Sequence, residues 1–174
     1  MSQLPPESFA RPTLPVARDL LGCRLCRSLD GEVLRPRITE TEAYDGPDDR
    51  ASHARRGPTP RSAVMFGPPG IWYLYLCYGI HWLLNIVTGP PTYPAAVLIR
   101  GTETVTGPGR LTKALAIDGD FNHRPASPES DLWIESGDPL DPSRVTASPR
   151  IGVAYAGPDW SQRPYRFQVR GNLP

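Results

Sequence analysis

Hydrophobic and polar residues alternate along several short stretches of this 174-residue chain, a pattern that predicts strands more than long helices. The clearest stretch is 38–44, ITETEAY, where a period of two places Glu40, Glu42 and Tyr44 on one face of a strand. The turn sequence at 45–48, DGPD, ends that strand. The sequence therefore predicts two carboxylates and a phenol side by side where a strand meets a loop.

The same reasoning predicts the other elements. Strands are expected at 23–29, 32–44, 71–78, 81–87, 93–100, 132–135, 150–155 and 165–170. Short helices are expected at 14–21 with Thr13 as its cap, at 59–65, and from about Gly109. A two-residue turn at Asp30-Gly31 predicts a hairpin that carries Glu42 and Tyr44 to the edge of a sheet, and polar loops are expected at 45–58 and 118–131.

The aromatic stretch 71–87 reads as a hairpin that turns at Tyr78-Gly79. Trp72, Tyr73 and Trp82 are interpreted as core residues. Tyr78, beside the turn glycine, is expected to project beyond the sheet.

Composition fits one domain, residues 1–174, with a proline-rich leader at 1–13. Proline and glycine supply 38 of the 174 residues, which implies many ordered loops between short elements. We therefore expect an α/β (α+β) fold: a mixed, mostly antiparallel curved sheet with short flanking helices and a protruding, aromatic-tipped β-hairpin. With no secretory signal or apolar run of eighteen residues, a soluble cytoplasmic protein is expected.

Net charge is +1, but positive charge is concentrated in the middle of the chain. Residues 50–113 include seven basic residues and one acidic residue, Glu103, which gives this region a net charge of +6. Such a region attracts a polyanion to one part of the surface. Eighteen of the nineteen basic residues are arginine, which suits bidentate phosphate contacts.

Cys23 and Cys26 form a lone C-x-x-C motif that lacks the further ligands of a zinc site, and we interpret them as strand residues. Cys77 is interpreted as a small apolar filler. No metal or other cofactor is expected.

Together these features match the needs of an enzyme that flips a nucleobase out of duplex DNA: stacking rings, a residue to fill the gap, and arginines for the backbone. A water that attacks the sugar carbon needs a general base, which Glu42 can supply. Lys113 is the only lysine and, with the chain terminus, the only amine nucleophile, so an enzyme that uses water and spares the strand is favoured.

Several blocks of the sequence resemble, in order from about residue 14 to 171, the alkyladenine (3-methyladenine) DNA glycosylase family. They are ETEAYDGPDDRASHARRGPTPR, MFGPPGIWYLYLCYGIHWLLNIV, AAVLIRG, GPGRLTKALAID, PRIGVAYAG and PYRFQVRGN. The resemblance implies a compact α/β enzyme that flips alkylated and deaminated purines out of duplex DNA and excises them without a metal. We expect a monofunctional enzyme that acts as a monomer.

The resemblance also implies residue roles. Glu42 would deprotonate the water, and Arg100 with the main-chain carbonyl of Ile151 would hold that water. Tyr44, His53 and Tyr75 would enclose the base, and Asn85 would disfavour guanine. Tyr78 would enter the minor groove. From the concentration of positive charge, the basic residues expected to contact DNA are Arg55, Arg56, Arg61, Arg110 and Lys113.

Alternatives remain open for several residues. Tyr75 could be core, His53 a loop histidine, and Asn85 bonded only to backbone. Spacing does not choose between Glu40 and Glu42; the family motif favours Glu42, and Glu40 is interpreted as an ion-pair partner. Ile80 and His81 at the hairpin tip match no residues of the family that we can assign.

Two rival functions are also open. One is a metal-dependent phosphodiesterase built on Asp45, Asp48, Asp49 and His53. The other is a non-catalytic protein that binds damaged DNA through Tyr78 and the arginines.

Overall fold

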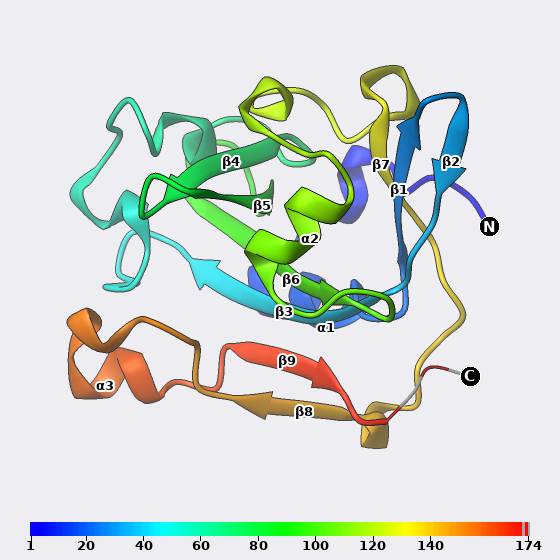
Figure 1. Ribbon diagram of the computed structural model, residues 1–174. Coiled ribbons are helices and arrows are strands. Elements are labelled where there is room, and N and C mark those ends of the chain that lie inside the picture. The colour runs from blue at the N-terminus through cyan, green and yellow to red at the C-terminus, as the bar shows by residue number, and fades with distance from the viewer. Residues whose placement is uncertain (172, 174) are drawn as a thin grey trace.

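Two antiparallel sheets form the framework of this computed structural model, which describes residues 1–171 and 173. The strands are β1 (Arg24–Leu29), β2 (Glu32–Leu34), β3 (Ile38–Asp45), β4 (Trp72–Cys77), β5 (His81–Val87), β6 (Ala95–Thr102), β7 (Leu132–Glu135), β8 (Val145–Ser148) and β9 (Arg166–Val169). The larger sheet has the order β4-β5-β6-β3-β9-β8, and the smaller has the order β2-β1-β7. Figure 1 shows β9 and β8 side by side in the lower part of the molecule.

Within the described residues, three short α-helices flank the sheets: α1 (Thr13–Asp19), α2 (Pro108–Ala114) and α3 (Gly157–Gln162). The α1 helix packs on β3 and β6, and Thr41 of β3 donates its hydroxyl hydrogen bond to the carbonyl of Ala17 at 2.8 Å. Fully buried apolar residues of this region, such as Ile38 and Ile99, belong to the main core. The core therefore lies behind β3, while the other face of β3 is available for polar side chains.

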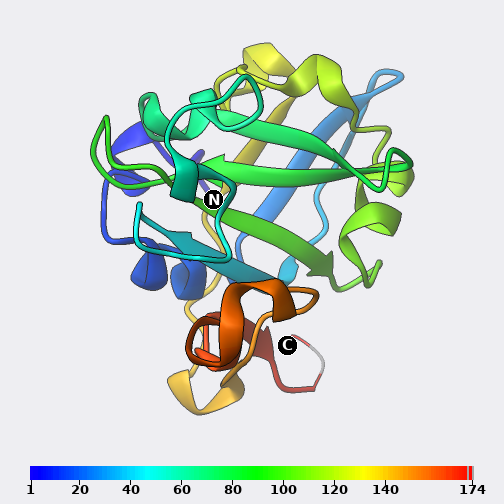
Figure 2. The same cartoon turned by 90° about the vertical axis from the view of Figure 1, so that its left-hand side faces the viewer.

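The β4–β5 hairpin follows the predicted ranges closely. Tyr78 and Gly79 at its turn both have left-handed backbone angles, with φ of 52° and 65°, as a two-residue turn of this kind requires. Figure 2 shows the hairpin tip projecting beside α2. The protruding aromatic hairpin and the α/β fold class are thus confirmed.

The predicted strand 32–44 is instead two strands in different sheets. β2 pairs with β1 as the Asp30-Gly31 turn predicted, but the chain leaves that sheet around Pro36. Proline has no N–H to donate to a ladder, which favours a break there. The expectation that Glu42 and Tyr44 lie at a sheet edge is wrong, because β3 lies between β6 and β9.

Three smaller predictions also need correction. No strand forms at 150–155 in the described structure: a short 3-10 helix, Ala154–Ala156, overlaps the end of this range, and β8 precedes it at Val145–Ser148. The helix expected at 59–65 is a 3-10 helix at Ala63–Phe66. Thr13 is the first residue of α1 and makes no capping hydrogen bond with its side chain.

Candidate active site

One row of directly opposed residues crosses all six strands of the larger sheet. From β4 to β8 it consists of Tyr73, Asn85, Leu98, Glu42, Arg166 and Ser148. Directly opposed residues of neighbouring strands lie on the same face of a sheet. Glu42 therefore has an aromatic ring and an amide along the row to one side, and an arginine to the other.

Glu42 is completely buried, yet its carboxylate is well supplied with donors. The Tyr44 hydroxyl donates to Oε2 at 2.9 Å, and the Ile151 main-chain N–H donates to Oε1 at 2.8 Å. Burial raises the pKa of Glu42, while the charge of Arg100 and these two hydrogen bonds oppose that rise. A carboxylate balanced in this way can act as a general base.

Arg100 lies next to both glutamates but bonds to only one of them. Its Nε donates to Glu40 Oε1 at 2.9 Å, whereas its Nη1 lies 3.6 Å from Glu42 Oε1. Arg166 donates to the same Glu40 oxygen at 2.9 Å. The interpretation of Glu40 as an ion-pair partner is confirmed.

Beside Glu42 lies a pocket with aromatic walls, lined by Tyr44, Ala51, Ser52, His53, Met65, Tyr73, Tyr75, Asn85, Ala96 and Tyr155. The rings of His53 and Tyr75 meet edge to face with centroids 4.5 Å apart. Glu42 lies behind this lining and is joined to it by the hydrogen bond from Tyr44. The structure thus brings together Tyr44, His53 and Tyr75 around one hollow.

Two pocket residues are tied to their surroundings by hydrogen bonds. His53 Nδ1 lies 2.8 Å from the Tyr73 hydroxyl, and burial lowers the pKa of His53, which favours a neutral imidazole. The Asn85 amide nitrogen donates to the carbonyls of Tyr73 and Leu83. Asn85 therefore bonds to backbone, as one alternative proposed, and also lines the pocket.

A family model described as "Methylpurine-DNA glycosylase (MPG)" matches residues 7–106 and 102–173 of the chain. The chain belongs to the methylpurine-DNA glycosylase family. A protein of Anaeromyxobacter dehalogenans (strain 2CP-C) is 50% identical over 178 residues, covering 98% of this chain and 84% of its own length. Similar proteins of Nitrosococcus oceani and Carboxydothermus hydrogenoformans are 44% and 40% identical, covering 97% of this chain and 90% and 96% of their own lengths. All three carry the name "Putative 3-methyladenine DNA glycosylase".

A DNA glycosylase must contact damaged DNA, and the positions expected to do so are on the surface. Tyr78 is 90% exposed at the hairpin tip, next to Ile80 at 72%. The basic residues predicted to contact DNA are all exposed: Arg55, Arg56, Arg61, Arg110 and Lys113. Two of them also border the pocket. The guanidinium carbon of Arg61 lies 5.4 Å from the ring centroid of Tyr75, and that of Arg55 lies 5.7 Å from the ring centroid of Tyr155.

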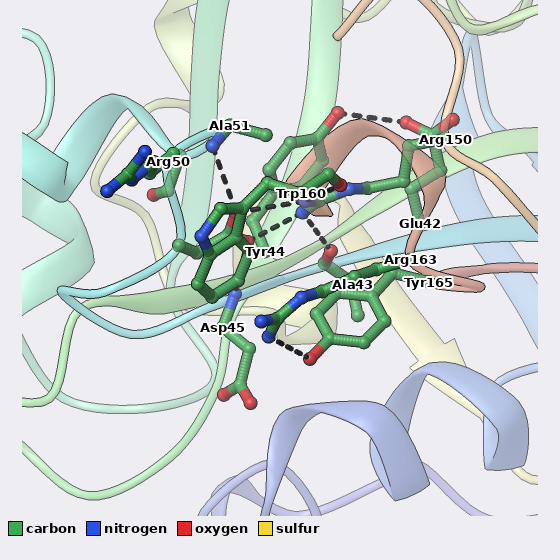
Figure 3. Close-up of polar contacts among 12 residues, drawn as sticks. Glu42, Ala43, Tyr44, Asp45, Arg50, Ala51, Arg150, Trp160, Arg163 and Tyr165 are labelled. Carbon is green, nitrogen blue, oxygen red and sulfur yellow. Dashed lines mark hydrogen bonds and ion pairs between the residues drawn. The ribbon is translucent and has the colours of Figure 1, made fainter. Parts of the chain in front are cut away.

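Sequence reasoning about this glycosylase missed three residues around the pocket. Arg150 packs beneath Tyr44 (Figure 3) and forms a buried ion pair with Asp49. The Tyr155 hydroxyl donates to the Ala51 carbonyl at 2.7 Å at the pocket rim. One signal was available for Arg150: an arginine beside an apolar stretch such as IGVAYA needs a partner.

Asp49, one carboxylate of the proposed phosphodiesterase site, is directed elsewhere in this family member. Asp49 accepts hydrogen bonds from the backbone N–H groups of Asp45 and Ala51, besides its ion pair with Arg150. The segment from Asp49 to His53 is not α-helical, so the expected pairing of side chains four residues apart does not form. Across residues 1–171 and 173, no three His, Cys, Asp or Glu side chains gather as metal ligands would.

In the same described part of the chain, no helix is long and apolar enough to cross a membrane. Cys23 and Cys26 are buried free thiols, and burial raises the pKa of Cys26 to about 12. Cys26 lies in β1 as predicted, and Cys23 immediately precedes that strand.

Proposed function

We propose that this glycosylase hydrolyses the N-glycosidic bond of alkylated or deaminated purines in duplex DNA, using a water that Glu42 deprotonates, and leaves an abasic site. The observation that carries the proposal is the environment of Glu42: a fully buried carboxylate, held by Tyr44 and Ile151, directly behind an aromatic pocket. The names of its relatives support the substrate class, because they refer to 3-methyladenine.

In this proposal the damaged nucleotide leaves the base stack and its base enters the pocket between Tyr44, His53 and Tyr75. Tyr78 occupies the space that the nucleotide leaves, and its exposure at the hairpin tip supports that role. Asn85 sits at the pocket lining, where it would crowd the 2-amino group of guanine.

The attacking water lies next to Glu42, held by Arg100 and the carbonyl of Ile151. Arg100 is within 3.6 Å of Glu42 but is bonded to Glu40, so it keeps donors for a water. Water then replaces the purine at the sugar carbon: a C–O bond forms, the water proton passes to Glu42, and the C–N bond breaks with its electron pair remaining on the purine. A cationic methylated purine leaves as a neutral base, and an uncharged deaminated purine takes up a proton from solvent as it leaves. One chain acts on each lesion.

The test is Glu42→Gln, which removes the base but keeps the shape of the side chain. We expect release of 3-methyladenine from duplex DNA to fall by at least about 10²-fold, while binding to the same duplex is retained. Glu103→Gln is the matched control, because Glu103 is a carboxylate in the loop that follows β6, where it pairs with Arg37.

The two rival functions give different results in this assay. If the protein only binds damaged DNA, wild type and Glu42→Gln release equally little base. If a metal-dependent phosphodiesterase operates, excess chelator stops the reaction and the products are cleaved strands, not free bases.

A further inference from the structure

Asp49 and Arg150 form an ion pair that is completely removed from solvent. The Arg150 Nη1 and Nη2 atoms donate to the two carboxylate oxygens of Asp49 at 2.6 and 2.9 Å, and both side chains are 0% exposed. Such a pair costs desolvation energy that its own attraction need not recover. Stability alone is therefore a weak reason for its presence.

Arg150 also contacts the strand that carries the site. Its Nη1 donates to the carbonyl of Ala43, the residue between Glu42 and Tyr44, at 2.9 Å. Its guanidinium lies between two rings, 4.8 Å from the centroid of Tyr44 and 5.1 Å from that of Tyr165. Figure 3 shows this arginine in the middle of the cluster.

The position of Arg150 in the chain matters as much as its contacts. The next residue is Ile151, whose N–H donates to Glu42 at 2.8 Å. Arg150 also packs beneath the ring of Tyr44, and the hydroxyl of Tyr44 is the second donor to Glu42. Both hydrogen bonds to the carboxylate thus come from groups that Arg150 holds.

We propose that Arg150, paired with Asp49, is a positioning residue for base release: it holds the Ile151 N–H and the Tyr44 hydroxyl against the Glu42 carboxylate. This inference rests on the proposed role of Glu42 as the general base. Arg150 is 0% exposed on its side chain, so it acts without touching DNA.

The proposal predicts an effect on the acidity of Glu42 as well as on rate. The titratable and charged groups around Glu42 come from every element packed against it. They are Glu40 and Tyr44 on its own strand, Arg100 on β6, Arg166 opposite it on β9, Tyr75 on β4, and Arg150 and Tyr155 on the segment before α3, which also supplies the Ile151 N–H. The arginines and the two hydrogen bonds lower the pKa of Glu42 against the effect of burial. Without Arg150, that pKa rises and Glu42 stays protonated to higher pH.

The experiment compares Arg150→Gln and Arg150→Lys with the control Arg163→Gln. Arg163 is an arginine of the same region that pairs with Asp159, stacks on Trp160 and donates to the Tyr165 hydroxyl at 3.4 Å. None of these three contacts is with Glu42 or with the groups that donate to it. Single-turnover release of a methylated purine is measured from pH 4.5 to 8, together with binding to a duplex carrying an abasic-site analogue. Circular dichroism checks the fold of each variant, and Arg150→Lys keeps the charge should Arg150→Gln fail to fold.

We expect Arg150→Gln to lose roughly 10- to 100-fold in rate, the scale of a small misplacement of reacting groups. The acid limb of its rate–pH profile should move to higher pH. The rate and the acid limb of Arg150→Lys should lie between those of Arg150→Gln and wild type. The affinity of both variants for the abasic-site duplex should stay within about twofold of the wild-type affinity. A folded Arg150 variant with the rate and acid limb of Arg163→Gln would overturn the proposal, as would a loss of rate matched by an equal loss of binding. If Glu42→Gln remains active, the proposed function fails instead.

Discussion

The imidazole Nδ1 of His53 and the hydroxyl of Tyr73 lie 2.8 Å apart at the back of the aromatic pocket. This contact fixes the orientation of a ring that forms one wall of the pocket and leaves Nε2 for other contacts. It also partly shields the histidine from solvent, and this burial lowers its pKa.

The lowered pKa of His53 predicts a specific dependence of stability on pH. Below about pH 6.5 the unfolded chain binds a proton that the buried imidazole resists, so the free energy of unfolding falls as pH drops through that value. We expect this loss to be smaller in His53→Gln, by at most about 1.4 kcal/mol per pH unit. Urea unfolding of both proteins at pH 7.5 and 5.5 measures it; parallel pH profiles would contradict the assignment of a buried, neutral histidine.

Glu40 is predicted to be important for stability. Its Oε1 accepts from both Arg100 and Arg166, and its side chain is only 8% exposed. Glu40→Gln removes the charge partner of Arg166 and leaves Arg100 with only the longer ion pair to Glu42 at 3.6 Å, so we expect a loss of about 3 kcal/mol in unfolding free energy. In the control Glu103→Gln, the broken pair is more exposed, and the expected loss is about 1 kcal/mol. Equal losses in chemical denaturation would rule out a special role for the Glu40 pair.

Tyr78 is predicted to lower the stability of the fold and to contribute to DNA binding. Its φ of 52° is unfavourable for a residue with a side chain, and its ring is 90% exposed. Tyr78→Gly should be more stable than Tyr78→Ala by about 1 kcal/mol, because glycine adopts this backbone conformation without strain.

Both Tyr78 variants should bind lesion DNA more weakly than wild type by about 1–3 kcal/mol, the scale of one lost stacking contact. Thermal unfolding and fluorescence anisotropy give the two quantities separately. Wild-type affinity in either variant would show that the hairpin tip does not enter the duplex.

The surface arginines should act on affinity without affecting lesion choice. Arg55→Gln and Arg110→Gln should each make the slope of log K against log salt less negative by about 1. Arg35→Gln is the control, because Arg35 is exposed on the side of the smaller sheet and pairs with Glu135. A wild-type slope in either variant would show that the replaced arginine does not contact a phosphate.

Local features of the fold were predictable and long-range ones were not. The β4–β5 hairpin was predictable because its strands and its turn lie within seventeen consecutive residues, 71–87. The central position of β3 was not, because its neighbour β9 lies far along the chain: Glu40 and Arg166 are 126 residues apart. Alternation within one strand carries no information about such a partner.

The candidate site shows the same division. Alternation placed Glu40, Glu42 and Tyr44 on one face, and the structure agrees. It did not distinguish the two glutamates, because their difference comes from other segments: two arginines bond to Glu40, whereas a main-chain N–H approaches Glu42. The apolar pattern after Arg150 predicted a strand, but the buried pair with Asp49 and the positive φ of Gly152 favour a loop.

The insertion of β9 between β3 and β8 has a consequence for synthesis of the protein on the ribosome. Until residues 166–169 emerge, one edge of β3 has unpaired backbone groups, and Glu40 lacks one of its two arginines. A nascent or truncated chain that stops before β9 therefore exposes an unpaired edge of β3, which can pair with a strand of another chain, next to a Glu40 that lacks its ion pair with Arg166. Such a chain is expected to aggregate rather than to act as a slow enzyme.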